Sequence, residues 1–291
     1  MKNVFSTYHP IINFCFFGSV IGISIFLKHP IFVLITVTAA FVYAMILDKK
    51  ATIRFSFSIL LMILLFTVIN PLVNARGKTI LFYTAYSKVT LEAAIYGCIS
   101  GFVMAAVLLW FYCYNKVITS DKFLFLFCKI IPSTSMVFSI VMRFIPHFHR
   151  QIQKISYAQK CIGQEVSNGK KIEKINHGMK ILSIMLTWAL ENAIDCADSM
   201  RARGYGSKNR STFSIYRFDT RDIFAAVFLV GLTIVVLSKI LMGKCSIAFY
   251  PTIVMHELDI VLCIAYMGLC YFPVILELRE LIVWKFLQSK I

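Results

Sequence analysis

The sequence predicts an all-α integral membrane protein with about six transmembrane helices and long amphipathic cytoplasmic helices. Of the 291 residues, 59% are hydrophobic, whereas ordinary soluble domains contain roughly 45–50%. The mean hydropathy is +0.77, and the apolar residues form long uninterrupted blocks. The middle of the chain is instead polar and strongly basic. We therefore expect N-terminal transmembrane helices (1–114), a cytoplasmic helical region (115–221) and C-terminal transmembrane helices (222–291).

Six apolar blocks mark the expected spans, because a helix needs about 20 mainly apolar residues to cross a bilayer. They cover residues 11–27, 30–47, 55–73, 93–114, 223–242 and 260–276. Residues 48–54 are expected to form a short basic loop and residues 74–92 a polar turn region. Gly97 and Gly101 lie four residues apart in the fourth span, which favours close packing against another helix.

The basic residues predict the orientation in the membrane. The formal net charge is +16, which could indicate nucleic acid or another acidic partner. With six spans and a cytoplasmic N-terminus, however, 24 of the 30 lysines and arginines fall on the cytoplasmic side and 6 on the other. Positive charge of this kind usually marks cytoplasmic segments. We therefore place the N-terminus and residues 115–221 in the cytoplasm and expect no nucleic-acid partner.

The cytoplasmic region contains one long predicted helix. Between residues 171 and 203, apolar side chains recur at steps of three and four, which is typical of an amphipathic helix about 50 Å long. We expect this stripe to lie against another apolar surface and to leave the arginine-rich end exposed. The stripe consists of Ile172, Ile175, Met179, Leu182, Leu186, Ala189, Ala193, Cys196 and Met200.

The segment before this helix is shorter and carries two prolines. Residues 130–142 are apolar but too few to span a bilayer, and Pro132 and Pro146 lie near their ends. This pattern favours an interfacial or re-entrant segment.

The sequence contains no recognisable nucleotide site. Gly77-Lys78-Thr79 resembles the end of a phosphate-binding loop, but Leu72 stands where that loop needs its first glycine. Gly169-Lys170 is not followed by serine or threonine. We therefore expect no nucleotide site in this chain. Because no catalytic set converges in the sequence either, we expect a non-catalytic chain that binds no cofactor.

The histidines and cysteines do not form a predicted metal site either. Ile260 stands where a second histidine would be needed, four residues after His256. His147 and His149 point to different sides of a helix. The nine cysteines include no Cys-X-X-Cys pair, and we expect them to be small apolar side chains and not disulfide partners.

Two basic motifs are the strongest candidates for function. The first is Met142-Arg143-Phe144-Ile145-Pro146, followed by Gln153, Ala158-Gln159 and Gly163. The second is Met200-Arg201-Ala202-Arg203-Gly204-Tyr205-Gly206, in which a glycine ends a helical run. A simpler interpretation of the second motif is a capped basic helix end that complements the helix dipole or anionic lipids.

In their order along the chain, these motifs resemble the transmembrane T component of energy-coupling-factor transporters, a family that includes the cobalt-transport protein CbiQ. The similar part extends from about residue 70 to residue 206. The matching segments are Asn70-Pro71-Leu72, Thr90-Leu91-Glu92, Pro132, Arg143-Phe144-Ile145-Pro146, Ala158-Gln159 and Ala202-Arg203-Gly204-Tyr205.

The resemblance implies a non-catalytic subunit in a bacterial cell membrane. In such transporters a membrane S component binds a vitamin or metal, and two ABC-type ATPases use ATP and Mg²⁺. The T component joins them through long cytoplasmic coupling helices. The resemblance names no particular solute and no number of S components, because recognition belongs to another subunit.

The resemblance also assigns two arginine motifs, one for each ATPase. The second is Ala202-Arg203-Gly204, with Arg201, Arg143 and Pro146 in support. The first falls within Ala158-Gln159-Lys160-Cys161-Ile162-Gly163, where Ile162 replaces the usual arginine and Lys160 is the nearest compensating charge.

Two other functions remain open at this stage. One is a stand-alone membrane channel or carrier with a regulatory cytoplasmic region. The other is a membrane enzyme with a dispersed site, which the lack of a convergent catalytic set disfavours.

Overall fold

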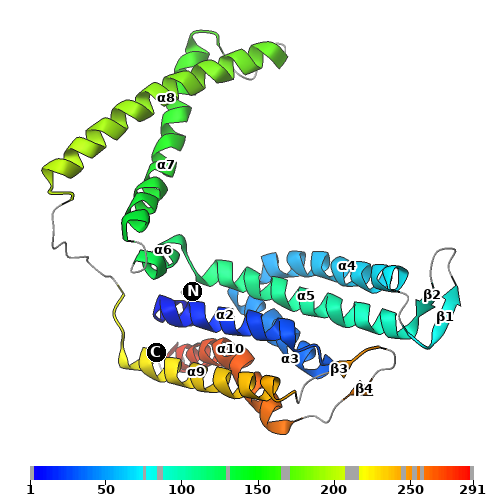
Figure 1. The fold of residues 1–291 in the computed structure, drawn as a ribbon. Helices are drawn as coiled ribbons and strands as arrows, with labels where there is room; N and C mark the ends of the chain where they lie inside the picture. Colours follow the sequence, from blue (N-terminus) through cyan, green and yellow to red (C-terminus); the bar gives the residue numbers. More distant parts are fainter. Residues whose placement is uncertain are drawn as a thin grey trace. The chain divides into compact units, whose positions relative to one another are not determined.

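The computed structural model describes residues 3–74, 77–83, 88–128, 132–164, 171–206, 216–243, 247–250, 254–255 and 259–288. It divides into two compact units (Figure 1). The first unit contains Met1–Phe123 and Tyr216–Ile291, and the second contains Leu124–Ile215. The predicted assignment of residues 1–114, 115–221 and 222–291 to membrane and cytoplasm stays a prediction.

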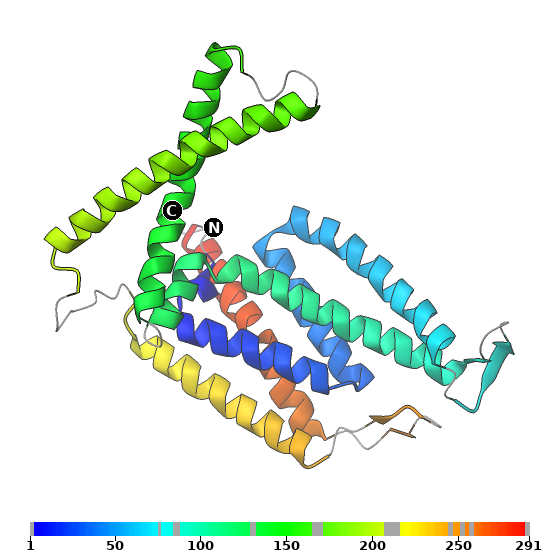
Figure 2. The same ribbon diagram turned by 45° about the horizontal axis from the view of Figure 1, so that its top comes forward.

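The first unit is a bundle of apolar helices, seen side by side in Figure 2. In the described part of the chain, five helices are long and apolar enough to cross a membrane, and α2 (Pro10–Phe26) is an apolar helix of 17 residues. The predicted all-α integral membrane fold is confirmed. The five long helices are α3 (Pro30–Leu47), α4 (Lys49–Val73), α5 (Leu91–Val117), α9 (Thr220–Leu241) and α10 (Ile260–Gln288).

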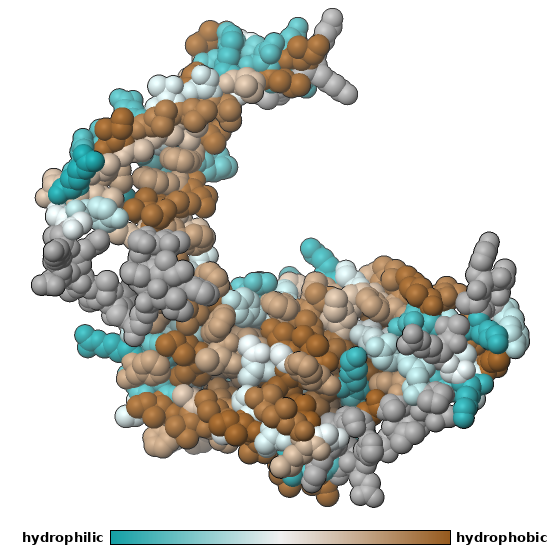
Figure 3. Space-filling view, in the orientation of Figure 1, coloured by the Kyte–Doolittle hydropathy of each residue, from teal (hydrophilic) through white to brown (hydrophobic). Residues whose placement is uncertain are grey.

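Buried aromatic rings hold the N-terminal helices together. The short helix α1 (Val4–Thr7) places Phe5 against Phe16 and Phe17 of α2, with ring centroids 5.2 and 6.1 Å apart. Trp110 of α5 contacts Phe16 at 5.7 Å. Each of these rings is no more than 1% exposed, so this cluster is fully buried in the core. On the outside of the same bundle, the helices expose many large apolar side chains, as Figure 3 shows.

The predicted basic loop at residues 48–54 is wrong, because α4 begins at Lys49. The carboxylate of Asp48 accepts the backbone N–H of Ala51 at 3.3 Å and so caps the first turn. Lys116 lies 3.3 Å from the same carboxylate. The Ala51 N–H and the Lys116 ammonium lower the pKa of Asp48. A side-chain cap thus starts the helix before the apolar block begins.

Two short antiparallel hairpins were not predicted. The first lies in the expected turn region and pairs β1 (Ile80–Tyr83) with β2 (Lys88–Thr90). Glu92 of α5 supports it by accepting the backbone N–H groups of Lys78 and Thr79 at 3.3 and 3.2 Å. The second hairpin pairs β3 (Ile247–Ala248) with β4 (Val254–Met255).

Gly97 and Gly101 of α5 lie against α4, as their spacing predicts. A Cβ atom at Gly97 would come within 2.8 Å of the Asn70 Cβ and 2.9 Å of the Phe66 carbonyl oxygen. At Gly101 it would lie 3.2 Å from the Ile63 Cα. The backbones of α4 and α5 therefore approach closely because these two side chains are missing.

The second unit consists mainly of two long crossing helices, α7 (Pro132–Cys161) and α8 (Lys171–Ala202), preceded by α6 (Ser120–Cys128), which begins in the first unit. The predicted long helix at residues 171–203 is confirmed. Residues 132–142 of the segment predicted to be interfacial or re-entrant belong to the continuous 30-residue helix α7, residues 130–131 lie outside the described part of the chain, and the position of the segment at the membrane stays a prediction. Pro146 lies inside α7, where it removes one backbone hydrogen bond from a helix that α8 supports on its other side.

The predicted contact stripe of α8 is correct only toward its C-terminal end. Ala189, Cys196 and Met200 are partly buried, and the contact face continues through Ile181, Met185, Trp188 and Asn192. In contrast, the first five members of the predicted stripe are between 54% and 74% exposed, and Ala193 is also exposed. The helix has two apolar faces, and the one with the large ring of Trp188 packs on α7.

We expect a larger side chain at Gly97 to destabilise the bundle. Gly97→Leu would force α4 and α5 apart, and overpacking of this kind costs about 1–3 kcal/mol. The midpoint of thermal unfolding in detergent should fall. Gly231→Leu in α9 is the matched control, because a Cβ atom there meets nothing within 4 Å. Equal midpoints for the two variants would contradict the close approach.

Candidate functional site

The C-terminal end of α8 presents Arg203 on a glycine-closed turn. The backbone N–H of Gly204 donates to the Arg201 carbonyl at 2.9 Å, and that of Tyr205 donates to the Met200 carbonyl at 3.0 Å. Gly204 has a φ of 79°, a conformation that favours glycine. This pair of hydrogen bonds is a Schellman motif, which fixes the backbone at the end of the helix, including that of Arg203.

The C-terminal end of α7 has the same backbone geometry. The N–H of Gly163 donates to the Lys160 carbonyl at 3.0 Å, and that of Gln164 donates to the Gln159 carbonyl at 2.9 Å. Gly163 has a φ of 80°. Ile162 and Arg203 therefore occupy equivalent positions, one residue before the glycine that closes each helix.

The two ends differ in the side chain that they present. Ile162 is 68% exposed and lies beside a recess of about 320 Å³ between the two helices. Lys180 of α8 donates to the Gln164 side-chain carbonyl at 3.2 Å on the rim of this recess. Ala158, Lys160 and Cys161 are also exposed. This end is therefore apolar at its tip, with positive charge nearby.

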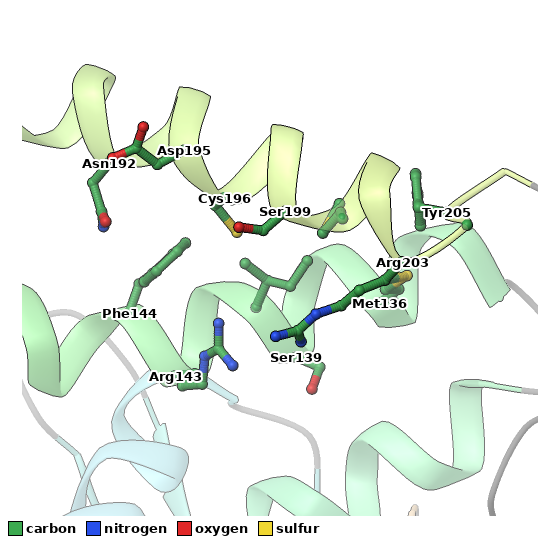
Figure 4. A pocket seen from close by; sticks show the side chains of 13 residues that line it. Met136, Ser139, Arg143, Phe144, Asn192, Asp195, Cys196, Ser199, Arg203 and Tyr205 are labelled. Atoms are coloured by element: carbon green, nitrogen blue, oxygen red, sulfur yellow. The ribbon is translucent and has the colours of Figure 1, made fainter.

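Beside Arg203, a cavity of about 810 Å³ opens between α7 and α8. Figure 4 shows Arg143 extending into it from α7 and Arg203 from α8. Asp195 lies on the same wall as Arg203, about two turns nearer the middle of α8. The fold thus brings together two arginines that lie 60 positions apart in the sequence.

The other predicted supporting residues lie outside this cavity. Arg201 is paired with Asp198 at 3.8 Å, and both side chains are strongly exposed. Such a pair contributes little to stability. Pro146 is exposed and does not line the cavity. Sequence analysis missed Asp195, since no local motif connects an aspartate on α8 with an arginine on α7.

Aromatic side chains fix the crossing of the two helices. Trp188 of α8 contacts His147 and Phe148 of α7, with ring centroids 5.1 and 5.7 Å apart. Phe148 also stacks on Phe144 at 5.7 Å, next to Arg143. This packing positions the wall of the cavity from which Arg143 extends.

The histidines have structural partners. His147 packs on Trp188, whereas His149 lies 3.2 Å from the Gln153 side chain. Among the described residues, no three His, Cys, Asp or Glu side chains are grouped so that they could hold a metal ion. His256-Glu257 and Gly169-Lys170 lie outside the described residues.

No protein-family model matches the sequence. Several curated proteins are similar to it. The chain is 28% identical over 213 residues to the energy-coupling factor transporter transmembrane protein EcfT of Leuconostoc gelidum, which covers 68% of this chain and 79% of the relative. It is 25% identical over 189 residues to EcfT 1 of Listeria monocytogenes, covering 60% and 70%.

The chain is similar to the transmembrane proteins of energy-coupling factor transporters. The resemblance inferred from the motifs is thus confirmed, and the chain is a multi-pass membrane protein. Its similarity to EcfT of Staphylococcus aureus, 29% identical, is confined to 102 residues, which are 35% of this chain and 38% of that relative. The chain therefore matches well under two thirds of that relative's length.

Proposed function

We propose that this chain is the non-catalytic coupling subunit of an energy-coupling-factor importer. It links two cytoplasmic ATPases, which bind ATP and Mg²⁺, to a membrane S component that binds a vitamin or a transition metal. The N-terminus and residues 115–221 face the cytoplasm. The main support is the exposed arginine at the glycine-closed end of α8.

The chemistry of Arg203 suits contact with a protein partner. A guanidinium forms two parallel hydrogen bonds to a carboxylate, and the Schellman motif holds its backbone in one conformation. Among the described residues, Arg203 forms no ion pair or hydrogen bond through its side chain. An acidic residue on an ATPase surface would supply this missing partner.

The two crossing helices suit the transmission of force. The 32 residues of α8 extend about 48 Å, since each helical residue adds about 1.5 Å. Trp188 packs this rod against α7 near its middle. A movement of an ATPase at one helix end would therefore move α7 and α8 together. A flexible loop would not transmit such a movement.

We expect Arg203→Ala to weaken the complex with the ATPase and to leave the chain in the membrane. Removing one partner of a desolvated charge pair typically costs about 2–5 kcal/mol. Co-purification of the co-expressed ATPases with a tagged chain measures this loss. Arg201→Ala is the control, because that arginine is already paired with Asp198 on the helix surface. Undiminished assembly and transport in the Arg203 variant would refute the proposed function.

The equivalent position on α7 allows the opposite change. Since Ile162 occupies the site that corresponds to Arg203, we expect Ile162→Arg to strengthen ATPase binding at that end, or at least to preserve it. Titration of each purified ATPase against the variant and the wild type checks this. Ile162→Gln is the control, because it removes the apolar tip without adding a charge. Weaker binding by the arginine variant than by both the wild type and the glutamine variant would show that a positive charge is unfavourable at this end, which contradicts the prediction.

The chain alone should not transport solutes. We expect liposomes that contain only this protein to show no uptake of vitamins or transition-metal ions, and uptake to require the ATPases, ATP and an S component. A radiolabelled-solute assay with and without these subunits measures the difference. Solute flux through the chain alone would favour a stand-alone channel or carrier.

A further inference from the structure

Arg143 and Arg203 converge on one cavity of the second unit. They reach it from different helices, α7 and α8, and their side chains extend toward the same space (Figure 4). Both residues are exposed in the structure, so the cavity is open to a partner.

Neither arginine forms an ion pair or a side-chain hydrogen bond with another described residue. Arg143 lies over the ring of Phe144, with 5.8 Å between the guanidinium carbon and the ring centroid. This contact restrains the arginine but leaves its N–H groups available. Arg201, which lies outside the cavity, is by contrast paired with Asp198.

The charges of the cavity match one additional carboxylate. Its lining contains Arg143, Arg203 and a single acidic residue, Asp195, which leaves one net positive charge. Ser139, Asn192 and Ser199 add neutral polar groups. One incoming carboxylate would neutralise the cavity, whereas a phosphate monoester with nearly two charges would leave it negative.

We propose that Arg143 is a second docking residue for the ATPase, and that Arg143 and Arg203 together bind one carboxylate side chain of that subunit. This inference rests on the proposed function and names the residue that completes its docking site. Two guanidiniums in one cavity repel each other when it is empty, and a shared carboxylate removes that repulsion. The contact therefore requires both helices in their crossed arrangement.

A double-mutant cycle with the co-expressed ATPases tests the proposal. Arg143→Met keeps the apolar part of the side chain over Phe144 and removes the charge. Arg150→Met is the matched control, because Arg150 lies seven residues later on nearly the same face of α7, about 10 Å farther along the helix. Arg203→Ala and the Arg143→Met/Arg203→Ala double variant complete the cycle.

We expect Arg143→Met to weaken ATPase binding at least about tenfold, as for the loss of one partner of a charge pair. If both arginines bind the same carboxylate, the fold-loss of ATPase affinity in the double variant should be far smaller than the product of the two single-variant losses. Arg143→Lys should restore binding only in part, because lysine keeps the charge without the paired N–H groups. Arg150→Met should bind like the wild type.

The outcomes separate this proposal from the proposed function. If Arg203→Ala weakens binding but Arg143→Met behaves like Arg150→Met, Arg143 has no docking role and the proposed function stands. If Arg203→Ala has no effect, the proposed function fails as well. If the two single-variant losses of ATPase affinity simply multiply in the double variant, the arginines contact separate groups. That result would refute a shared carboxylate.

Two further measurements distinguish ATPase docking from helix packing and from lipid binding. Equal thermal unfolding midpoints for the Arg143→Met and Arg150→Met variants show that lost binding does not reflect lost packing. Binding of the purified chain to phosphatidylglycerol vesicles identifies a lipid ligand. If Arg143→Met weakens vesicle binding and leaves ATPase binding in detergent unchanged, the cavity binds a lipid headgroup and the proposal is wrong.

Discussion

The packing of Trp188 against α7 is the contact on which the second unit depends. Long isolated helices gain little stability in water, and most of their stability comes from the apolar face that they bury. In this unit Trp188 supplies the largest ring of that face and meets both His147 and Phe148. The stacked Phe144 extends the same contact toward Arg143. The position of a charged side chain is thus set by apolar packing one turn away.

In the bundle of the first unit, some buried polar groups pair across helices that are far apart in the sequence. Thr36 and Tyr266 are both buried, and their hydroxyl oxygens lie 2.6 Å apart between α3 and α10. In the C-terminal half of α10, the buried Glu277 carboxylate accepts the backbone N–H of Phe5. These contacts connect the N-terminal and C-terminal helices, which is why residues so distant in sequence form one unit.

The sequence predicts those features that depend on local composition. Uninterrupted apolar blocks reveal most spans, and glycines four residues apart reveal the close contact of α5 with α4. The start of α4 was missed because a single capping aspartate, Asp48, outweighs the basic residues that follow it. Pro146 does not mark the end of a helix, since it lies within α7, which tertiary packing stabilises.

The candidate site could be predicted only in part, for a similar reason. The motif around Arg203 is continuous in sequence, and so is the degenerate motif around Ile162. The cavity, however, combines Arg143 and Asp195 from two helices, and their proximity depends on how α7 and α8 cross. The periodic pattern of α8 does not specify that crossing, because the helix carries two apolar faces. Ile172 and Leu182 on the second face are 74% and 54% exposed, so periodicity alone assigns the contact to the wrong face.

The ends of α7 and α8 allow the contributions of backbone and side chain to partner binding to be separated. Both close with the same pair of hydrogen bonds and with a glycine whose φ is near 80°. A difference between the partners of these ends therefore cannot arise from backbone geometry. It must come from the side chain before the glycine and from its surroundings, which are an isoleucine beside Lys180 at one end and an arginine beside Arg143 at the other. The same helix terminus can thus present two chemically different contacts within one small unit.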